Sequence, residues 1–191
     1  MAKSVRCEWY GFEAQHRWED CPVIACEVLE VVRPKFALEL GTAGGGFAAF
    51  LAGTLAAWGG SVVTVDIAVN DDLIARLEGS FANLSVWRGD CLSSVPPILD
   101  RLIRGAEYQP CLVYCDDGNK PLEIELYAPL IPVGSLIGCH DYEDEVPSAW
   151  VEPHLTALGF APYRHEAFEA LAHPVDYPRS LSRFWIRERL A

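Results

Sequence analysis

The amino-acid sequence predicts an α/β fold built around a parallel sheet, and three observations support this. Short apolar runs alternate with segments whose apolar residues recur at helical spacing, which is typical of βαβ units. No internal repeat and no Gly/Ser-rich or Pro-rich linker interrupts the alternation. The length of 191 residues corresponds to about one ordinary domain. We therefore expect one domain over residues 1–191, beginning with a segment and helix over 1–34.

The composition is that of a globular, acidic protein. Hydrophobic residues make up 51% and charged residues 22%, which is enough apolar material for a core. The chain has 15 Lys+Arg and 27 Asp+Glu, which gives a formal net charge of -12. Because this charge repels nucleic acids and anionic membranes, we expect neither as a partner. No apolar stretch reaches the ~20 residues of a membrane span, and the N-terminus lacks the apolar centre of a signal peptide. We therefore predict a cytoplasmic protein.

Seven cysteines are scattered along the chain, an odd number without a C-x-x-C pair. This spacing favours neither a disulfide framework nor a zinc site. Those in or beside apolar runs are expected to be small buried hydrophobic residues: Cys111, Cys115 and Cys139.

The first helix is predicted from its two ends. It is expected to start at Asp20, with Pro22 in its first turn. It is expected to stop at Arg33-Pro34, because a proline disfavours helical geometry in the residue before it. Its apolar face is then expected to carry Ile24, Val28 and Val31.

The remaining elements follow from changes between strand-like and helix-like spacing. The run 111–115 is almost entirely apolar, so this strand is expected near the centre of the sheet. Asn70 is predicted to cap a helix that reaches Gly79, and Ser94 to open a helix that ends before Gly105. Further helices are predicted at 47–58, 121–131 and within 148–158. Strands are predicted at 36–40, 61–66, 85–88, 111–115, 134–139, 160–164 and 182–187.

Acidic residues stand at or beside the ends of the first five predicted strands. In a parallel sheet, ligands bind beside the carboxyl ends of the strands. We therefore expect these side chains to border one common cleft. They are Glu39, Asp66, Asp90, the pair Asp116-Asp117, and Asp141.

The turn Gly41–Gly46 joins the first strand to a helix. Glycines tolerate positive φ and let a ligand approach the backbone closely. Asp66 ends the next strand, where its carboxylate can accept both hydroxyls of a ribose. Asp90 follows Gly89 at the third strand end, where it can reach an adenine amino group. Together these features predict a slot for adenosine.

Two adenosine ligands fit such a slot, a nicotinamide dinucleotide and S-adenosylmethionine. The dinucleotide fingerprint is G-x-G-x-x-G, with pyrophosphate on the helix N-terminus. Here the pattern is E-x-G-x-x-G from Glu39 to Gly44, and this acid would repel pyrophosphate but suit the ammonium of methionine. S-adenosylmethionine is favoured, while an NAD-dependent oxidoreductase and a non-catalytic binding protein stay open. A non-haem iron oxygenase is not favoured, because its two-histidine and carboxylate triad is not matched by the adjacent His140 and Asp141.

Six stretches carry a resemblance to a known family: Glu39–Gly46, Val65-Asp66, Gly89-Asp90, Val113–Asp116, Glu125–Leu130 and Gly134–Asp141. On these stretches the chain resembles class I S-adenosylmethionine-dependent methyltransferases. It is most similar to the small O-methyltransferases of the cephalosporin hydroxylase or rhamnosyl O-methyltransferase family, and more distantly to macrocin and catechol O-methyltransferases. The likeness covers roughly residues 9–142, and the leader Trp9–Gln15 is similar to the family's substrate-side segment.

The resemblance implies a Rossmann-like, doubly wound sheet of seven strands, mostly parallel, whose last strand is antiparallel. It also implies S-adenosyl-L-methionine as the cofactor, with the glycine turn on its methionine side, Asp66 on the ribose, and Asp90 with Cys91 beside the adenine. The cofactor-binding residues predicted in this way are Glu39, Gly41, Thr42, Ala43, Gly44, Gly45, Gly46, Asp66, Ile67, Gly89, Asp90, Cys91 and Asp116.

The resemblance further implies a divalent metal, commonly Mg²⁺, bound by carboxylates at two strand ends. Asp116 or Asp117 stands at one of these ends and Asp141 at the other. The adjacent His140 is a poor ligand for magnesium but acceptable to manganese, iron or zinc, so the identity of the metal is open. Lys120 follows Asp117 at the spacing of a lysine in catechol-type relatives.

The predicted function is an O-methyltransferase acting on a hydroxyl of a small molecule, such as a sugar or a secondary metabolite. A sulfonium methyl is a strong electrophile, so the protein must mainly align the acceptor oxygen and lower its pKa. Lys120 or His140 is predicted to take the proton, beside a metal that stabilises the alkoxide. The aromatic residues ahead of the sheet could pack on a second copy, so a homo-oligomer stays open. No partner can be named for His16, His154, His165 or His173.

Overall fold

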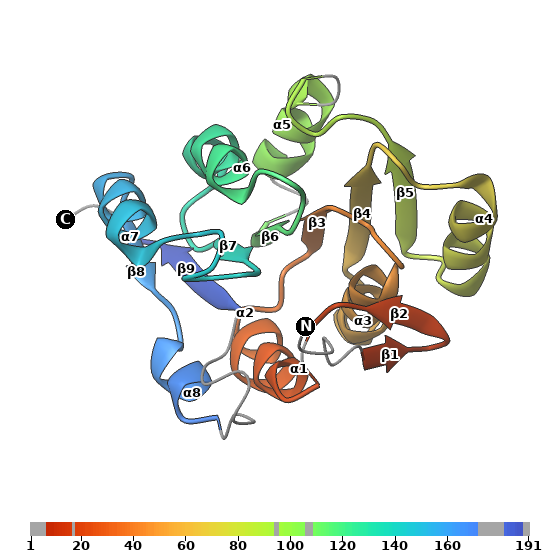
Figure 1. Cartoon of the computed structure of the whole chain (residues 1–191), viewed down its shortest axis with the longest axis horizontal. Coiled ribbons are helices and arrows are strands. Elements are labelled where there is room, and N and C mark those ends of the chain that lie inside the picture. Colours follow the sequence, from red (N-terminus) through yellow and green to blue (C-terminus); the bar gives the residue numbers. More distant parts are fainter. Residues whose placement is uncertain (1–6, 17, 94–95, 106–108, 172–181, 189–191) are drawn as a thin grey trace.

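The structure, a computed structural model, describes residues 7–16, 18–93, 96–105, 109–171 and 182–188. The first five sheet strands along the chain are parallel neighbours, and the last strand is antiparallel to both strands beside it. The predicted seven-stranded, mostly parallel sheet with an antiparallel last strand is therefore confirmed (Figure 1). In spatial order the strands are β5 (Leu84–Arg88), β4 (Ser61–Asp66), β3 (Phe36–Leu40), β6 (Cys111–Cys115), β7 (Leu136–Cys139), β9 (Arg183–Arg187) and β8 (Phe160–Pro162).

Helices cover both faces of this sheet (Figure 1). Successive strand residues point to opposite faces, so Tyr114 of β6 belongs to one core cluster and Val113 to the other. The Tyr114 face is covered by the first helical run, α1 (Asp20–Val23), η1 (Ile24–Leu29) and α2 (Glu30–Val32), and by α3 (Gly46–Leu55) with η2 (Ala56–Trp58), α4 (Asp71–Ser80) and α8 (His165–Glu169). The Val113 face is covered by α5 (Pro96–Arg104), α6 (Lys120–Tyr127) with η4 (Ala128–Leu130), and α7 (Ser148–Ala157).

The first helical run differs from its prediction in the interior. It begins at Asp20 and ends at Arg33 as expected, but η1 is a π-helix between two short α-helices. A π-helix has about one more residue per turn, which rotates the following residues around the helix axis. Val31 is therefore 53% exposed, and Leu29 is fully buried in its place. The prediction that Val31 belongs to the apolar face is wrong.

Most other elements match their predictions, with changes at their ends. Asn70 caps α4 by accepting a hydrogen bond from the backbone N–H of Leu73 at 2.9 Å. The β6 strand is fully buried and central, as its composition predicts. β8 ends at Pro162, and the chain then forms α8, which has too few residues to leave a helical pattern. Ser94, predicted to open the fifth helix, lies outside the described residues.

A small hairpin precedes the sheet and was not predicted, because strands of three residues leave no periodic signal. Its strands, β1 (Cys7–Trp9) and β2 (Phe12–Ala14), pack against α3. Glu13 forms a bridge to Gly45, and Arg76 of α4 donates a hydrogen bond to the carbonyl of Gly11 at 3.0 Å. The hairpin therefore brings the following residues over the glycine-rich turn. Among the described residues, the longest helices fall short of a membrane-crossing apolar span.

Candidate functional site

The glycine-rich turn brings the ends of β3 and β6 into contact. Gly41 has a φ of +95°, and a Cβ on it would lie 2.5 Å from the carbonyl oxygen of Asp116. Only glycine tolerates both the positive φ and this close approach. The turn therefore places the start of α3 directly against the residues that follow β6.

Asp66 holds this turn in place. One oxygen of its carboxylate accepts hydrogen bonds from the backbone N–H groups of Thr42 and Ala43, both at 3.0 Å. The other oxygen accepts from Ala68 at 2.6 Å. Ala43 has a φ of +44°, an unfavourable conformation for alanine that these bonds maintain. The predicted ribose ligand is thus engaged with the protein backbone in this structure.

Glu39 is the most unusual acid of the site. It is 1% exposed, and its Oε2 has no hydrogen-bond partner among the described residues. In the sheet it stands between Thr64 of β4 and Tyr114 of β6. Burial raises the pKa of Glu39 well above its ordinary value; a hydrogen bond with Thr64 opposes this rise, whereas the charge of Asp116 adds to it. A buried acid without a full set of partners indicates a place for a ligand.

Glu39 borders a cavity of about 40 Å³, together with Asp116, the glycine-rich turn and residues 13–16. Asp66 and Asp90 do not line it. This cavity therefore does not join all the strand-end acids, and the expected common cleft stays a prediction. The end of β2 packs tightly on the turn: a Cβ on Gly44 or Gly46 would lie 2.6 Å from atoms of Glu13 or Ala14.

His16 is a site residue that the sequence analysis missed. Its ring stacks on Phe47 of α3 at 3.9 Å between centroids, with 5° between the planes. Its Nε2 lies 3.1 Å from the Tyr114 hydroxyl and 3.6 Å from a carboxylate oxygen of Asp116. Burial lowers the pKa of His16 well below its ordinary value, and the positive charge of His140 lowers it further, so the ring is neutral. The sequence carries no signal for these contacts, because the partners are far apart along the chain.

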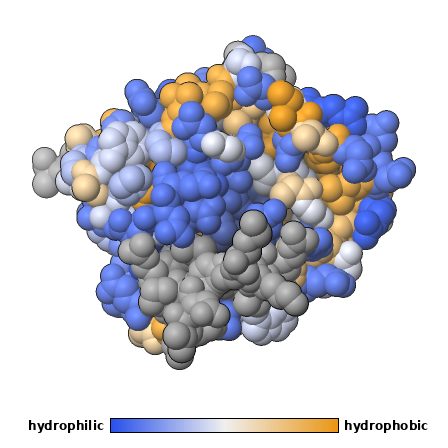
Figure 2. Space-filling view, in the orientation of Figure 1, coloured by the Kyte–Doolittle hydropathy of each residue, from blue (hydrophilic) through white to orange (hydrophobic). Residues whose placement is uncertain are grey.

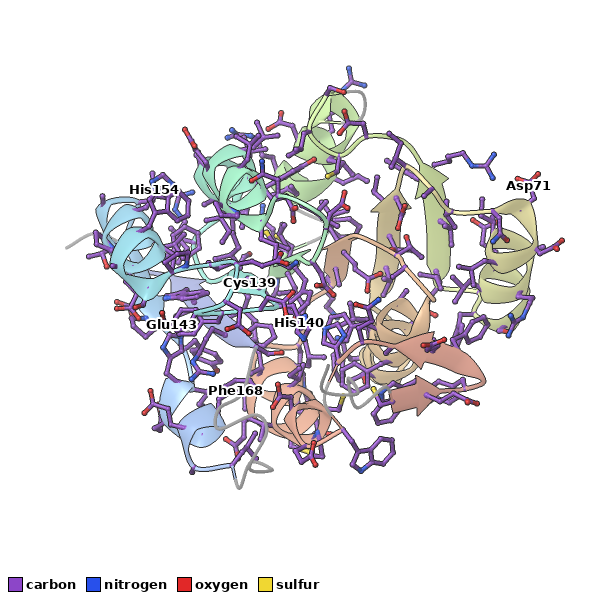
Figure 3. All side chains as sticks on the ribbon, viewed as in Figure 1. Asp71, Cys139, His140, Glu143, His154 and Phe168 are labelled. Carbon is purple, nitrogen blue, oxygen red and sulfur yellow. The ribbon has the colours of Figure 1, made fainter. Side chains whose placement is uncertain are left out.

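Asp116, His140 and Asp141 form a compact cluster at the ends of β6 and β7. One donor atom from each lies within 4.8 Å of the others. His140 Nδ1 is 3.4 Å from Asp116 and 3.2 Å from Asp141. Burial alone would lower the pKa of His140, but the two carboxylates raise it to about 10. Figure 3 shows His140 near the centre of the molecule, whereas Asp71 and His154 lie toward opposite sides.

The pKa values of the two acids of the cluster are shifted in opposite directions. Burial raises the pKa of Asp116, and His140 and Lys120 oppose this rise. For Asp141 burial acts in the same direction, but His140 and Lys120 prevail and hold the pKa of that carboxyl well below its usual range. Asp141 is therefore the permanently ionised member of the cluster.

The pleat of β6 decides between Asp116 and Asp117. Asp116 continues the Leu112–Tyr114 face and points into the cluster. Asp117 points to the other face, where its carboxylate accepts a weak hydrogen bond from the thiol of Cys91 at 3.4 Å. Asp117, predicted as a metal ligand, thus lies apart from the cluster. This choice could have been predicted from the alternation of β6.

Lys120 lies inside the cluster, at the first position of α6. Its Nζ is 3.0 Å from Asp141, 2.8 Å from Glu145 and 3.8 Å from Asp116. Burial alone would lower the pKa of Lys120, but these carboxylates raise it further above its ordinary value. Lys120 and His140 are therefore both cations in this metal-free arrangement, and their predicted role as a base stays a prediction. Figure 2 shows hydrophilic residues gathered beside α7, over the loop that contains Glu145.

Asp90 and Cys91, which are predicted to lie beside the adenine, belong to a turn that follows β5. Asp90 accepts hydrogen bonds from the backbone N–H of Leu92 at 2.9 Å and from the Ser93 hydroxyl. The Ser93 bond lowers the pKa of Asp90. Cys91 is buried, and its carbonyl accepts a hydrogen bond from the Tyr127 hydroxyl at 2.5 Å. Ile67, also predicted here, is 66% exposed, so an apolar side chain is available beside this turn.

Comparison with known proteins identifies the fold. No protein-family model and no curated protein matches the sequence. Among solved structures, an apo form of CmcI is similar with a TM-score of 0.66 and 14% identity. The match covers 96% of this chain and 77% of the CmcI chain. CmcI with Mg and SAM gives 0.62 at 16% identity, covering 93% and 76%. A Staphylococcus aureus protein assigned as a caffeoyl-CoA O-methyltransferase gives 0.58 at 15% identity, covering 88% and 82%. The chain shares its Rossmann-like fold with these structures.

Replacing Glu39 by glutamine is expected to change how stability depends on pH. Since folding raises the pKa of this acid, its stabilising contribution is complete below its ordinary pKa of 4.5 and is lost as the pH rises toward the folded value. The free energy of unfolding of Glu39→Gln relative to the wild type should therefore increase with pH, by up to about 1.4 kcal/mol per pH unit. Urea unfolding at about pH 5 and about pH 8 measures this, and a difference independent of pH contradicts it.

Replacing Asp141 by asparagine is expected to destabilise the fold by about 2 kcal/mol. The buried cations Lys120 and His140 would then lose one of the two carboxylates of the cluster that neutralise them. Asparagine tolerates the φ of +53° at this position, so the backbone is preserved. The matched control is Glu125→Gln, an exposed position on α6, which should stay within about 0.5 kcal/mol of the wild type. Equal unfolding free energies for the two variants in urea would show that the cluster is not a stabilising ion network.

Proposed function

We propose that the protein is an S-adenosylmethionine-dependent O-methyltransferase that acts on a hydroxyl of a small molecule, such as a sugar or a secondary metabolite. The observation that carries the proposal is the buried carboxylate of Glu39, whose Oε2 faces no partner among the described residues and which borders a cavity at the glycine-rich turn. The fold adds support, because the similar CmcI is known in a form with Mg and SAM. We further propose a cytoplasmic location.

The ligand that fits this carboxylate is cationic. The ammonium of a methionine moiety would neutralise Glu39 and supply the missing donor to Oε2. A pyrophosphate at the same turn would add negative charge beside Glu39, Asp66 and Asp116, which argues against a nicotinamide dinucleotide. The donor set at the turn therefore supports S-adenosylmethionine.

The cavity of about 40 Å³ holds no more than a water or two, so the cofactor would need more room. We propose that residues 13–16 move outward when it binds. Asp66 would then bind the ribose beside the turn, and Asp90, Cys91 and Ile67 would border the adenine. Tight packing of Glu13 and Ala14 on Gly44 and Gly46 supports this segment as the part that must move.

The cluster at the ends of β6 and β7 also fits a divalent metal. Asp116, His140 and Asp141 offer two carboxylate oxygens and an imidazole nitrogen within 4.8 Å of one another. This mixed donor set suits manganese, iron or zinc as well as magnesium. When bound, the metal would supply a Lewis acid that lowers the pKa of the acceptor hydroxyl.

The chain's own residues would orient the acceptor and manage its proton. S-adenosylmethionine supplies the electrophilic methyl group. In the metal-free site, Lys120 and His140, both cations, would stabilise negative charge that develops on the acceptor oxygen rather than take its proton. His16 Nδ1 is buried and has no partner among the described residues, and it is the group we assign to accept the proton.

Calorimetry with S-adenosylhomocysteine tests the cofactor. The wild type should bind it, and Glu39→Gln should weaken binding at least about tenfold, because the ammonium loses its counter-charge. Glu125→Gln, an exposed matched control, should bind like the wild type. Absence of binding by the wild type would refute the proposal, and a fluorescence change with reduced nicotinamide in its place would favour an oxidoreductase.

A His16→Phe variant tests the proposed base. Phenylalanine preserves the stack on Phe47 but cannot accept a proton. Turnover should fall by about 100-fold or more, measured as S-adenosylhomocysteine release with an acceptor taken from a panel of hydroxylated sugars and phenols. The affinity for S-adenosylhomocysteine should change by less than about threefold. Unchanged turnover would remove His16 from the chemistry.

A further inference from the structure

We propose that Lys120 is an internal cation that competes with a divalent metal for Asp116 and Asp141, so that the metal binds only when the ammonium leaves them. The inference rests on the proposed function in one respect: it takes Asp116, His140 and Asp141 as the metal donors. It adds a regulatory role for Lys120, since this residue would decide how tightly the cluster binds its metal.

The ammonium of Lys120 is surrounded by oxygen atoms, as a bound cation would be. Its Nζ lies 3.0 Å from Asp141 Oδ2 and 3.8 Å from Asp116 Oδ1. It also donates to Glu145 Oε2 at 2.8 Å and to the Asp117 carbonyl at 3.1 Å. Two of these oxygens belong to the carboxylates of the metal cluster. The lysine thus neutralises the charge that would attract the metal.

The position of Lys120 is fixed from the helix side. Lys120 is the first residue of α6 and is 4% exposed. Asn119 caps the helix by accepting a hydrogen bond from Leu122 at 3.3 Å, and Glu123 accepts one from the Asn119 N–H at 3.1 Å. Such a capped start restricts the backbone of Lys120. The ammonium therefore stays near the cluster even when its side chain rotates.

The loop after β7 supplies an alternative partner for the ammonium. Asp141 has a φ of +53°, and its carbonyl accepts hydrogen bonds from Asp144, Glu145 and Val146. This tight loop turns Glu145 back toward Lys120. The side chain of Glu145 is 54% exposed, and it is not one of the three metal donors. When a metal takes Asp141, Glu145 can keep the ammonium at the solvent side of the site.

A metal and an ammonium repel each other strongly at this separation, because both lie in a partly buried site. A metal bound to Asp116 and Asp141 would be only a few ångströms from the present position of Nζ. Metal binding must therefore displace the lysine, and this displacement weakens the metal's apparent affinity. Removing the ammonium should consequently tighten metal binding even though a side chain is lost.

The test is Mn²⁺ binding, measured by electron paramagnetic resonance of free Mn²⁺ on the full-length protein. Lys120→Met and Lys120→Gln should each bind Mn²⁺ at least about tenfold more tightly than the wild type. Lys120→Gln keeps hydrogen-bonding capacity in case the methionine variant does not fold. Lys35→Met is the matched control: Lys35 is exposed, its ammonium donates only to the Trp58 carbonyl among the contacts described, and its replacement should leave the affinity unchanged.

Two results would overturn the inference. One is a gain below tenfold in the folded Lys120 variants. The other is absence of Mn²⁺ binding in the wild type and in every variant. S-adenosylhomocysteine binding, followed in parallel by calorimetry, reports on the proposed function independently. If the wild type does not bind S-adenosylhomocysteine but the Lys120 variants still bind Mn²⁺ more tightly than the wild type, the methyltransferase assignment is refuted. The proposed competition between Lys120 and the metal is then still supported.

Discussion

The site depends on negative charge that converges at the carboxyl ends of β3, β6 and β7. A parallel sheet brings these ends to one edge, so Glu39, Asp116 and Asp141 are held near one another by the fold itself. Carboxylates that are removed from water need donors or cations. Lys120 and His140 supply them for Asp116 and Asp141, whereas Glu39 Oε2 has no partner among the residues described. Asp116 and Asp141 are thus compensated by protein cations, whereas Glu39 is the acid to which the proposed function assigns a cationic ligand.

The segment after the hairpin completes this arrangement from outside the sheet. His16 lies on Phe47 and reaches both Tyr114 and Asp116, so one residue connects the glycine-rich turn to the cluster. Glu13 and Ala14, which directly precede this segment at the end of β2, pack tightly on the turn. Access to Glu39 and the position of His16 are therefore coupled, because a displacement that opens the cavity also changes the surroundings of the cluster.

The sequence predicts the elements that have a clear period and misses those that do not. The five parallel strands, α3, and the cap of α4 each follow from local spacing and capping chemistry. The π-helix escapes prediction because one extra residue in a turn leaves the apolar composition unchanged, and the hairpin escapes because its strands are too short. Among the site residues, the acids at strand ends are predictable from topology. His16 and Glu145 are not, since their partners are brought to them only by the packing of the hairpin and of the 141–146 loop.

The proposed ammonium site and the proposed metal site differ in the protein groups that already contact their carboxylates. A ligand ammonium at Glu39 would meet an oxygen, Oε2, that has no partner among the described residues, so it would displace few protein groups. A metal at the cluster would instead have to displace protein cations, because Lys120 and the protonated His140 already contact the carboxylates of Asp116 and Asp141. The two adjacent carboxylate sites thus differ in whether protein cations already contact their acids. In the proposed function, this difference would make metal binding more dependent on displacement of a protein cation than cofactor binding.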